Sequence, residues 1–122
     1  MNQVGLVGRL VRTPELHEIE NKRKMTKVTL ALTRSFKNVN GEYETDFIDV
    51  LLWDNMAVNT VNFCKKGDII SIRGRLQSRI IDKNGEKRYV IEVVAEKVTF
   101  ISNARKINPE VEDDEFDIDD EK

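Results

Sequence analysis

Apolar and polar residues alternate along most of this 122-residue chain, a pattern typical of β-strands that bury one face. The alternation predicts five strands, at residues 2–11, 27–33, 45–53, 69–81 and 87–96, with 98–101 extending the last pairing. Turn signals separate the strands, and Asp-Lys-Asn-Gly at residues 82–85 predicts a tight hairpin between the last two. Residues 56–64 form the one predicted helix, and Gly67 follows it where a left-handed residue commonly ends a helix.

Five strands with one short helix between the third and fourth match the OB-fold, a small Greek-key barrel that binds oligonucleotides. Periodicity alone leaves other small all-β barrels open. From Asn103 onward the sequence turns polar, Pro109 interrupts it, and an acidic run follows. Such a segment buries too little apolar surface to offset the entropy of ordering. We therefore expect an OB-fold domain at residues 1–104 and a short, disordered acidic tail at 105–122.

The net charge of −2 averages two opposed parts of the chain. Residues 110–122 contain nine acidic residues and one lysine, a net charge of −8, which leaves residues 1–109 with a net charge of +6. A basic body favours a polyanion such as nucleic acid as its partner. The acidic tail can imitate that polyanion or bind a basic protein.

Few residues in this composition could carry catalysis or hold a metal. His17 is the only histidine and Cys64 the only cysteine, so no zinc site or nucleophile pair is indicated, and we expect Cys64 to be a small buried apolar residue. No apolar run approaches the roughly 20 residues that span a bilayer, and no secretory signal is visible. We expect a cytoplasmic binding protein rather than an enzyme, with no cofactor, no metal and no membrane partner.

The third predicted strand presents two aromatic residues on its outer face. Ile48, Val50 and Leu52 share an aliphatic face that should lie in the core. The opposite face then carries Phe47 and Trp53, which could stack on unpaired bases, a contact worth roughly 1–3 kcal/mol per base. Packing of these rings against another subunit or under a loop is the alternative interpretation.

The fourth predicted strand carries three arginines on one face. Alternation places its aliphatic residues on one face, namely Ile70, Ile72, Leu76 and Ile80. Arg73, Arg75 and Arg79 face the other way and form a strip suited to phosphates, although a solvated outer face would show the same pattern. Further cations expected nearby in a barrel are Arg34, Lys37, Lys83, Lys87 and Arg88.

Taken together, these segments resemble the bacterial and phage single-stranded DNA-binding protein family, often called SSB. The resemblance runs from about Asn2 to Ile101 and is carried by the order and spacing of residues 2–10, 30–36, 46–53, 57–59, 66–79 and 89–94. It implies an OB-fold, usually a homotetramer paired partly through residues 4–7, that binds single-stranded DNA without sequence preference during replication, recombination and repair. It also implies a protein associated with the nucleoid.

The resemblance places the family's stacking aromatics on Phe36, Phe47 and Trp53 of this chain. Strict alternation would put Phe36 in the core, so its exposure requires a bulge or strand end near residues 33–35. A further family aromatic is replaced by Ile81, which has no π-face. Asp49 lies on the implied DNA face and should repel phosphate unless a neighbouring arginine pairs with it.

The family's acidic tail commonly ends in Pro-Phe and recruits replication and repair proteins. This chain ends in Asp-Asp-Glu-Lys, and its apolar tail residues are Phe116 and Ile118. The tail is therefore interpreted either as a weakened docking peptide built on these two residues or as a solubilising charge run.

Other functions fit parts of the pattern. An OB-fold module for RNA or a primosome-type accessory protein would use the same basic and aromatic face. A protein-interaction scaffold would bury the aromatics in an interface. An OB-fold nuclease would need clustered carboxylates with a metal, and the body shows no convincing set.

Overall fold

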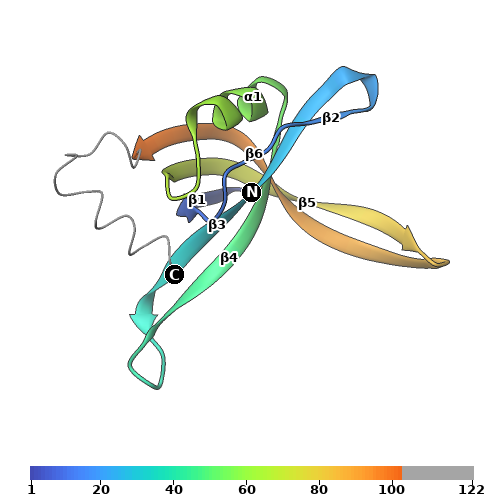
Figure 1. The fold of residues 1–122 in the computed structure, drawn as a ribbon. Helices are drawn as coiled ribbons and strands as arrows, with labels where there is room; N and C mark the ends of the chain where they lie inside the picture. The colour runs from blue at the N-terminus through green and yellow to red at the C-terminus, as the bar shows by residue number, and fades with distance from the viewer. Residues whose placement is uncertain (103–122) are drawn as a thin grey trace.

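The computed structural model describes residues 1–102, and the tail residues Phe116 and Ile118 lie outside them. Within the described range, six strands and one α-helix follow one another along the chain (Figure 1). The strands are β1 (Val4–Leu10), β2 (His17–Ile19), β3 (Arg23–Lys37), β4 (Tyr43–Trp53), β5 (Ile69–Lys83) and β6 (Glu86–Ser102). The 3-10 turn η1 (Glu20–Lys22) links β2 to β3, and α1 (Asp54–Phe63) links β4 to β5.

The strands form a closed five-stranded barrel with β2 added outside it. The sheet order is β1-β5-β6-β4-β3-β2, and a further pairing of β1 with β3 closes the barrel. This topology, with the helix between β4 and β5, confirms the predicted OB-fold. Alternation missed β2 because it has only three residues and all of them are exposed.

Two glycines allow strands to approach closely enough to close the barrel. A Cβ on Gly8 would lie 2.8 Å from the carbonyl oxygen of Ala31 in β3. A Cβ on Gly74 would lie 2.3 Å from the carbonyl oxygen of Val94 in β6, next to a register shift in that pairing. Neither position tolerates a side chain without movement of the backbone.

The core is aliphatic and lies inside the barrel beneath α1. Its fully buried side chains include Leu10, Leu30, Val50, Leu52 and Ile70. The helix begins two residues before the predicted start and buries Ala57 and Thr60, whereas Phe63 is 64% exposed and its ring lies 6.2 Å from that of Phe100.

Cys64 follows the helix and is buried, as expected. Burial, and secondarily the charge of Asp68, raises the pKa of its thiol to about 11. The group is therefore held as a neutral thiol.

Three β-ribbons project from the barrel in different directions, as Figure 1 shows for β2–β3, β3–β4 and β5–β6. Because of their length, only part of the aliphatic face of β5 lies in the core, namely Ile70 and Ile72. Leu76 and Ile80 are 44% and 55% exposed because the β5–β6 ribbon runs beyond the barrel and leaves no core beneath them. The predicted turn at its tip is confirmed, since Asn84 and Gly85 connect paired residues and both have positive φ.

Within residues 1–102, no helix combines the length and the apolar character needed to cross a membrane.

Candidate functional site

The outer face of β4 presents Phe47 to solvent. Ile48, Val50 and Leu52 pack inward, as alternation predicts. Phe47 points outward, is 61% exposed and lies opposite Ala31 of β3, whose small side chain leaves the ring open. One face of this ring is therefore free to receive a flat partner.

Trp53 lies on the same face at the end of β4 but is partly buried. Arg23 lies across from this end of the strand, with its guanidinium 4.4 Å from the centre of the indole ring. The same guanidinium donates to Asp54 at 2.7 Å, and this pairing raises the pKa of Arg23 and lowers that of Asp54. Arg23 therefore occupies part of the stacking surface of Trp53.

Cross-strand registers place the β4 aromatics and the β5 arginines on one continuous outer surface. Leu51 pairs with Lys27 of β3 on one side and with Val94 of β6 on the other. Val94 in turn pairs with Arg75 of β5. Paired residues share a face of a sheet, so this row of four strands joins the two predicted halves of the site.

Two of the three β5 arginines pair with carboxylates of β6. Arg79 donates to Glu92 at 2.8 Å, and Gln77 also contacts that carboxylate. The hydrogen bond from Arg79 lowers the pKa of Glu92 despite its partial burial. Arg75 lies 3.6 Å from Glu96. Arg73 has no ion pair among residues 1–102, which leaves it the least compensated cation of the strip.

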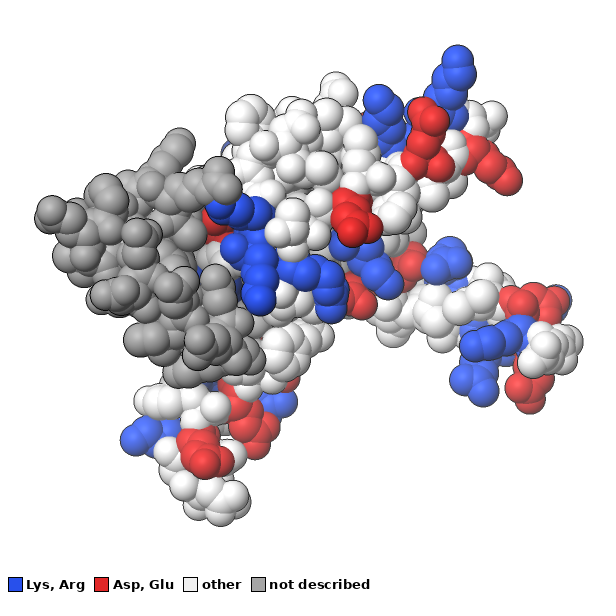
Figure 2. Space-filling view, in the orientation of Figure 1, with Lys and Arg blue, Asp and Glu red and all other residues white. Residues whose placement is uncertain are grey.

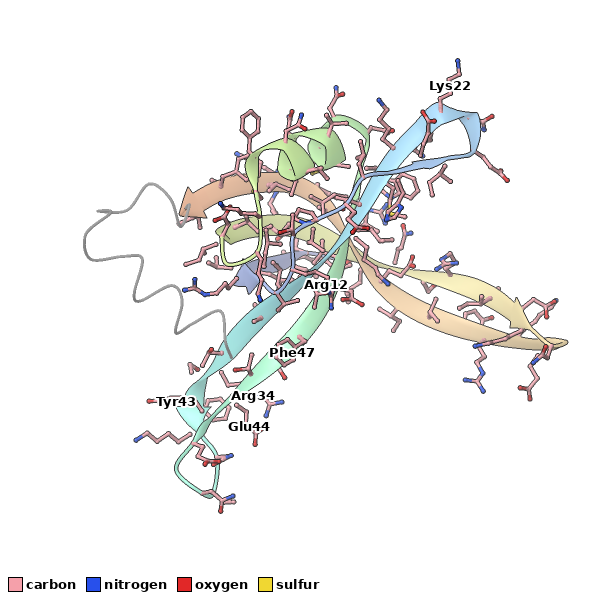
Figure 3. All side chains as sticks on the ribbon, in the orientation of Figure 1. Arg12, Lys22, Arg34, Tyr43, Glu44 and Phe47 are labelled. Carbon is pink, nitrogen blue, oxygen red and sulfur yellow. The ribbon has the colours of Figure 1, made fainter. Side chains whose placement is uncertain are left out.

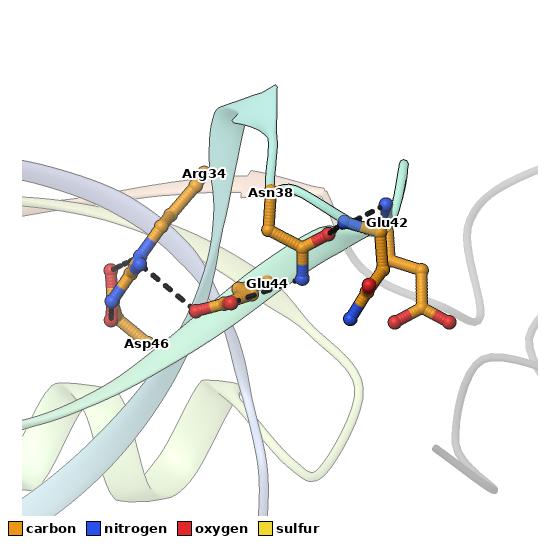
Figure 4. A network of polar contacts seen from close by, with 6 residues as sticks. Arg34, Asn38, Glu42, Glu44 and Asp46 are labelled. Atoms are coloured by element: carbon orange, nitrogen blue, oxygen red, sulfur yellow. Dashed lines mark hydrogen bonds and ion pairs between the residues drawn. The ribbon is translucent and has the colours of Figure 1, made fainter.

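Arg34 is held by carboxylates near the tip of the β3–β4 ribbon (Figure 4). It donates to Asp46 at 2.9 Å and to Glu44 at 3.0 Å, and Glu44 also accepts from Asn38. The bond from Arg34 lowers the pKa of Asp46. By alternation, these carboxylates lie on the face opposite Phe47, so the structure separates Arg34 from the outer face of β4.

Phe36 is 71% exposed, and its assignment to the core by alternation alone is wrong. The β3–β4 register shifts between Thr33 and Lys37, as the resemblance required, and beyond Leu32 no core covers the ribbon. Of the remaining predicted cations, Lys37 lies 5.7 Å from the ring centre of Tyr43 near this tip. Lys87 pairs opposite Asp82 near the far tip of β5–β6.

Asp49 lies two residues from Phe47 on the same outer face and is part of a polar chain. Its Oδ1 accepts a 2.6 Å hydrogen bond from the hydroxyl of Thr29, and that hydroxyl accepts one of 2.8 Å from Arg12. Lys27 lies 3.9 Å from its Oδ2. The charge of Asp49 is thus compensated by a lysine rather than by a direct arginine pair.

Three contributors to this face were missed by the sequence analysis: Arg12, Arg23 and Lys27. Lys27 could have been found, since it occupies an outward position of its predicted strand. Arg23 could not, because the strand was expected to begin four residues later, and Arg12 reaches Thr29 from a loop.

Positive charge gathers on the face drawn in Figure 2, where Lys and Arg side chains cross the middle of the barrel and acidic groups lie among them toward the ribbons. Figure 3 shows Arg12 near this centre and Phe47 further along β4, with Arg34, Tyr43 and Glu44 toward the tip. In the part of the chain that the structure describes, no three His, Cys, Asp or Glu side chains gather as metal ligands would.

The solved structures include a close match to this fold. The wild-type single-stranded DNA binding protein from Thermus aquaticus superposes with a TM-score of 0.73 at 27% identity, over 84% of this chain and 50% of that one.

Curated relatives are closer in sequence. Single-stranded DNA-binding protein B of Bacillus subtilis is 43% identical over 101 residues, 82% of this chain and 89% of that protein. A single-stranded DNA-binding protein of Halalkalibacterium halodurans is 44% identical over 102 residues, 83% of this chain and 61% of that protein. This chain thus spans about three fifths of the length of the second relative.

The sequence profile of the Single-strand binding protein family matches residues 1–101, almost the whole described body with its barrel, its outward aromatics and its arginine strip. The chain belongs to the Single-strand binding protein family.

Proposed function

We propose that this chain binds single-stranded DNA, largely without regard to base order, and protects it during replication, recombination and repair. The observation that carries the proposal is the exposed ring of Phe47 on an outer surface continuous with Arg75. Bases stack on Phe47 and Trp53, and on Phe36 toward the ribbon tip. Phosphates follow Arg73, Arg75 and Arg79. A binding role, and no catalytic one, is what these groups support.

Titration of Trp53 fluorescence with poly-dT at two salt concentrations tests the proposal. Binding should weaken with salt, with a slope of roughly −0.7 per phosphate contact on single strands. An indole signal that does not respond to poly-dT would instead favour an interface role for the aromatics. Competition by poly-U as strong as by poly-dT would favour the RNA-binding alternative.

A matched pair of variants isolates the stacking contribution. Phe47→Ala should weaken binding of an end-labelled dT oligomer about 5- to 150-fold, the loss expected for one stacked base. Phe63→Ala removes an equally exposed phenylalanine from α1 and should leave affinity unchanged. Equal losses in both variants would count against the proposed face.

We also propose that the chain works as a homotetramer. β1 pairs with β5 from Val4 to Arg9 but with β3 only at Arg9 and Leu10. The other edge of residues 4–7 pairs with no strand among residues 1–102, and Val7 is 57% exposed. An unpaired strand edge of this kind can pair with a second copy. Sedimentation equilibrium of the full chain should give four subunits, and a monomer would overturn the assignment.

Three further assignments complete the proposal. The domain comprises residues 1–104, and the acidic segment 105–122 competes with DNA or docks replication and repair proteins through Phe116 and Ile118. The protein acts in the cytoplasm, on the nucleoid.

Deletion of residues 110–122 should tighten binding of single-stranded DNA at low salt. Equal affinities of the two forms would rule out competition between the acidic segment and DNA.

A further inference from the structure

A carboxylate lies beside the exposed aromatic ring on the face proposed to bind a polyanion. Phe47 and Asp49 are successive outward residues of β4, so their side chains leave the strand about 7 Å apart. A phosphate over Asp49 would be repelled by its charge. The part of a nucleotide that can lie there is the base, whose edge extends this far from a ring stacked on Phe47.

The carboxylate of Asp49 is oriented by a hydrogen bond, but its acceptor capacity is not fully used. The Thr29 hydroxyl donates to Oδ1 at 2.6 Å, and Arg12 donates to that hydroxyl in turn. Lys27 lies 3.9 Å from Oδ2, within ion-pair range but beyond hydrogen-bond length. A carboxylate has about four lone-pair sites, so acceptor capacity remains on both oxygens. The side chain is 55% exposed, which leaves this capacity open to a ligand.

Neighbouring carboxylates are more fully engaged. Glu92 accepts two nitrogens of Arg79 and one of Gln77. Asp46 accepts two nitrogens of Arg34 and lies on the opposite face. Among these three carboxylates, Asp49 alone combines a position beside Phe47 with an oxygen, Oδ2, that accepts no hydrogen bond from residues 1–102.

We propose that Asp49 accepts hydrogen bonds from the base stacked on Phe47 and favours guanine there, an inference that rests on the proposed function. Unpaired bases expose their Watson–Crick edges to side chains. Guanine offers two adjacent donors on that edge, N1–H and N2–H, which match the two oxygens of a carboxylate. Thymine offers one donor between two carbonyls, and cytosine and adenine each place a ring acceptor beside their amino group. The result is a local preference imposed on binding that is otherwise indifferent to sequence.

The test compares short dT oligomers that carry one central dG, dC, deoxyinosine or dT, with binding followed by anisotropy of an end label. For the wild-type protein, dG should tighten binding about fivefold or more relative to dT, the low end of a two-donor base contact. Deoxyinosine keeps N1–H and lacks the N2 amino group, so it should lose most of this gain without any change to the protein.

Asp49→Asn should remove the difference between dG and dT. Glu44→Gln makes the same change in charge on the opposite face of the ribbon and should retain the difference. Equal affinity of wild-type protein for dG and dT oligomers would overturn the inference and leave the proposed function standing. If Asp49→Asn instead raised the affinity for all oligomers by the same factor, the inference would also be overturned, since such a result is explained by the loss of charge repulsion alone. Failure of the dT oligomer itself to bind would overturn both.

Discussion

Arg23 lies against Trp53, with its guanidinium 4.4 Å from the centre of the indole ring. Arg23→Ala should therefore uncover the ring, and the quenching constant of Trp53 fluorescence by acrylamide should rise. Stability should change little, because both Arg23 and its partner Asp54 are about half exposed. Lys24→Ala is the control, since among the described residues this neighbouring cation forms no cation–π contact with the ring. An unchanged quenching constant in Arg23→Ala would show that the stacked arrangement does not persist in solution.

Gly74, the one glycine of β5, should not be replaceable without a loss of stability. An alanine Cβ there would meet the carbonyl oxygen of Val94 at 2.3 Å, and backbone cannot rotate away as a side chain can. We expect Gly74→Ala to lower the free energy of unfolding by about 3 kcal/mol or more, or to prevent folding.

Gly5 provides the comparison for Gly74. Nothing lies within 4 Å of a Cβ at Gly5, so Gly5→Ala should be neutral or stabilise the fold by up to about 1 kcal/mol. Chemical denaturation of both variants checks this. Similar effects at the two positions would mean that the β5–β6 approach is looser than described.

Thr60 is fully buried in α1, and its hydroxyl has no hydrogen-bond partner among residues 1–102. Thr60→Val replaces an unsatisfied hydroxyl by a methyl group of similar size, which should raise the free energy of unfolding by about 1 kcal/mol. Thr60→Ser keeps the hydroxyl and loses the methyl group, so it should destabilise the fold. Thermal melting of the two variants tests this prediction. A destabilised Thr60→Val variant would show that the hydroxyl has a hydrogen-bond partner in solution.

The pairing of Glu92 with Arg79 should make stability depend on acid. The pKa of Glu92 is lower in the folded chain than the ordinary value of 4.5, chiefly through the hydrogen bond from Arg79. Its contribution is therefore complete above 4.5 and is lost as the pH falls through the lower folded value.

The difference in denaturation midpoint between wild-type protein and Glu92→Gln should thus be constant around neutral pH and shrink on acidification. Glu86→Gln changes a tip glutamate that forms no ion pair with any described residue, and it should show no such trend. A difference that grows in acid would contradict the assigned direction of the pKa shift.

Alternation predicted the core of β4 correctly because both neighbours of that strand belong to the closed barrel. Every inward residue from Ile48 to Leu52 therefore packs against side chains from the other strands of the barrel. The same rule failed for Phe36, which lies on a ribbon that outruns the barrel, and Leu76 and Ile80 are exposed for the same reason. Alternation predicts which side chains lie on the same face of a strand. It does not predict whether a core covers that face, because the core is built by strands that are distant in sequence.

The arginine strip shows a similar division between what was predictable and what was not. The shared face of Arg73, Arg75 and Arg79 follows from parity within one strand. The pairing of Arg79 with Glu92 and of Arg75 with Glu96 follows from the register of β5 against β6, which shifts between Arg73 and Gly74. Local pattern therefore located the cations, but their degree of compensation required the folded chain.

The two short seams that close the barrel have a consequence for folding kinetics. β1 pairs with β3, and β4 with β6, through two residue pairs each, whereas the β3–β4 and β5–β6 hairpins are long and are joined by loops of five and two residues. Hairpins close small loops and can form early. The β1–β3 and β4–β6 pairings join segments that are distant in sequence, so they form after the hairpins. Gly8→Ala, at the β1–β3 seam, should then accelerate unfolding more than it slows refolding in stopped-flow experiments. The opposite pattern would place this crossing in the folding nucleus.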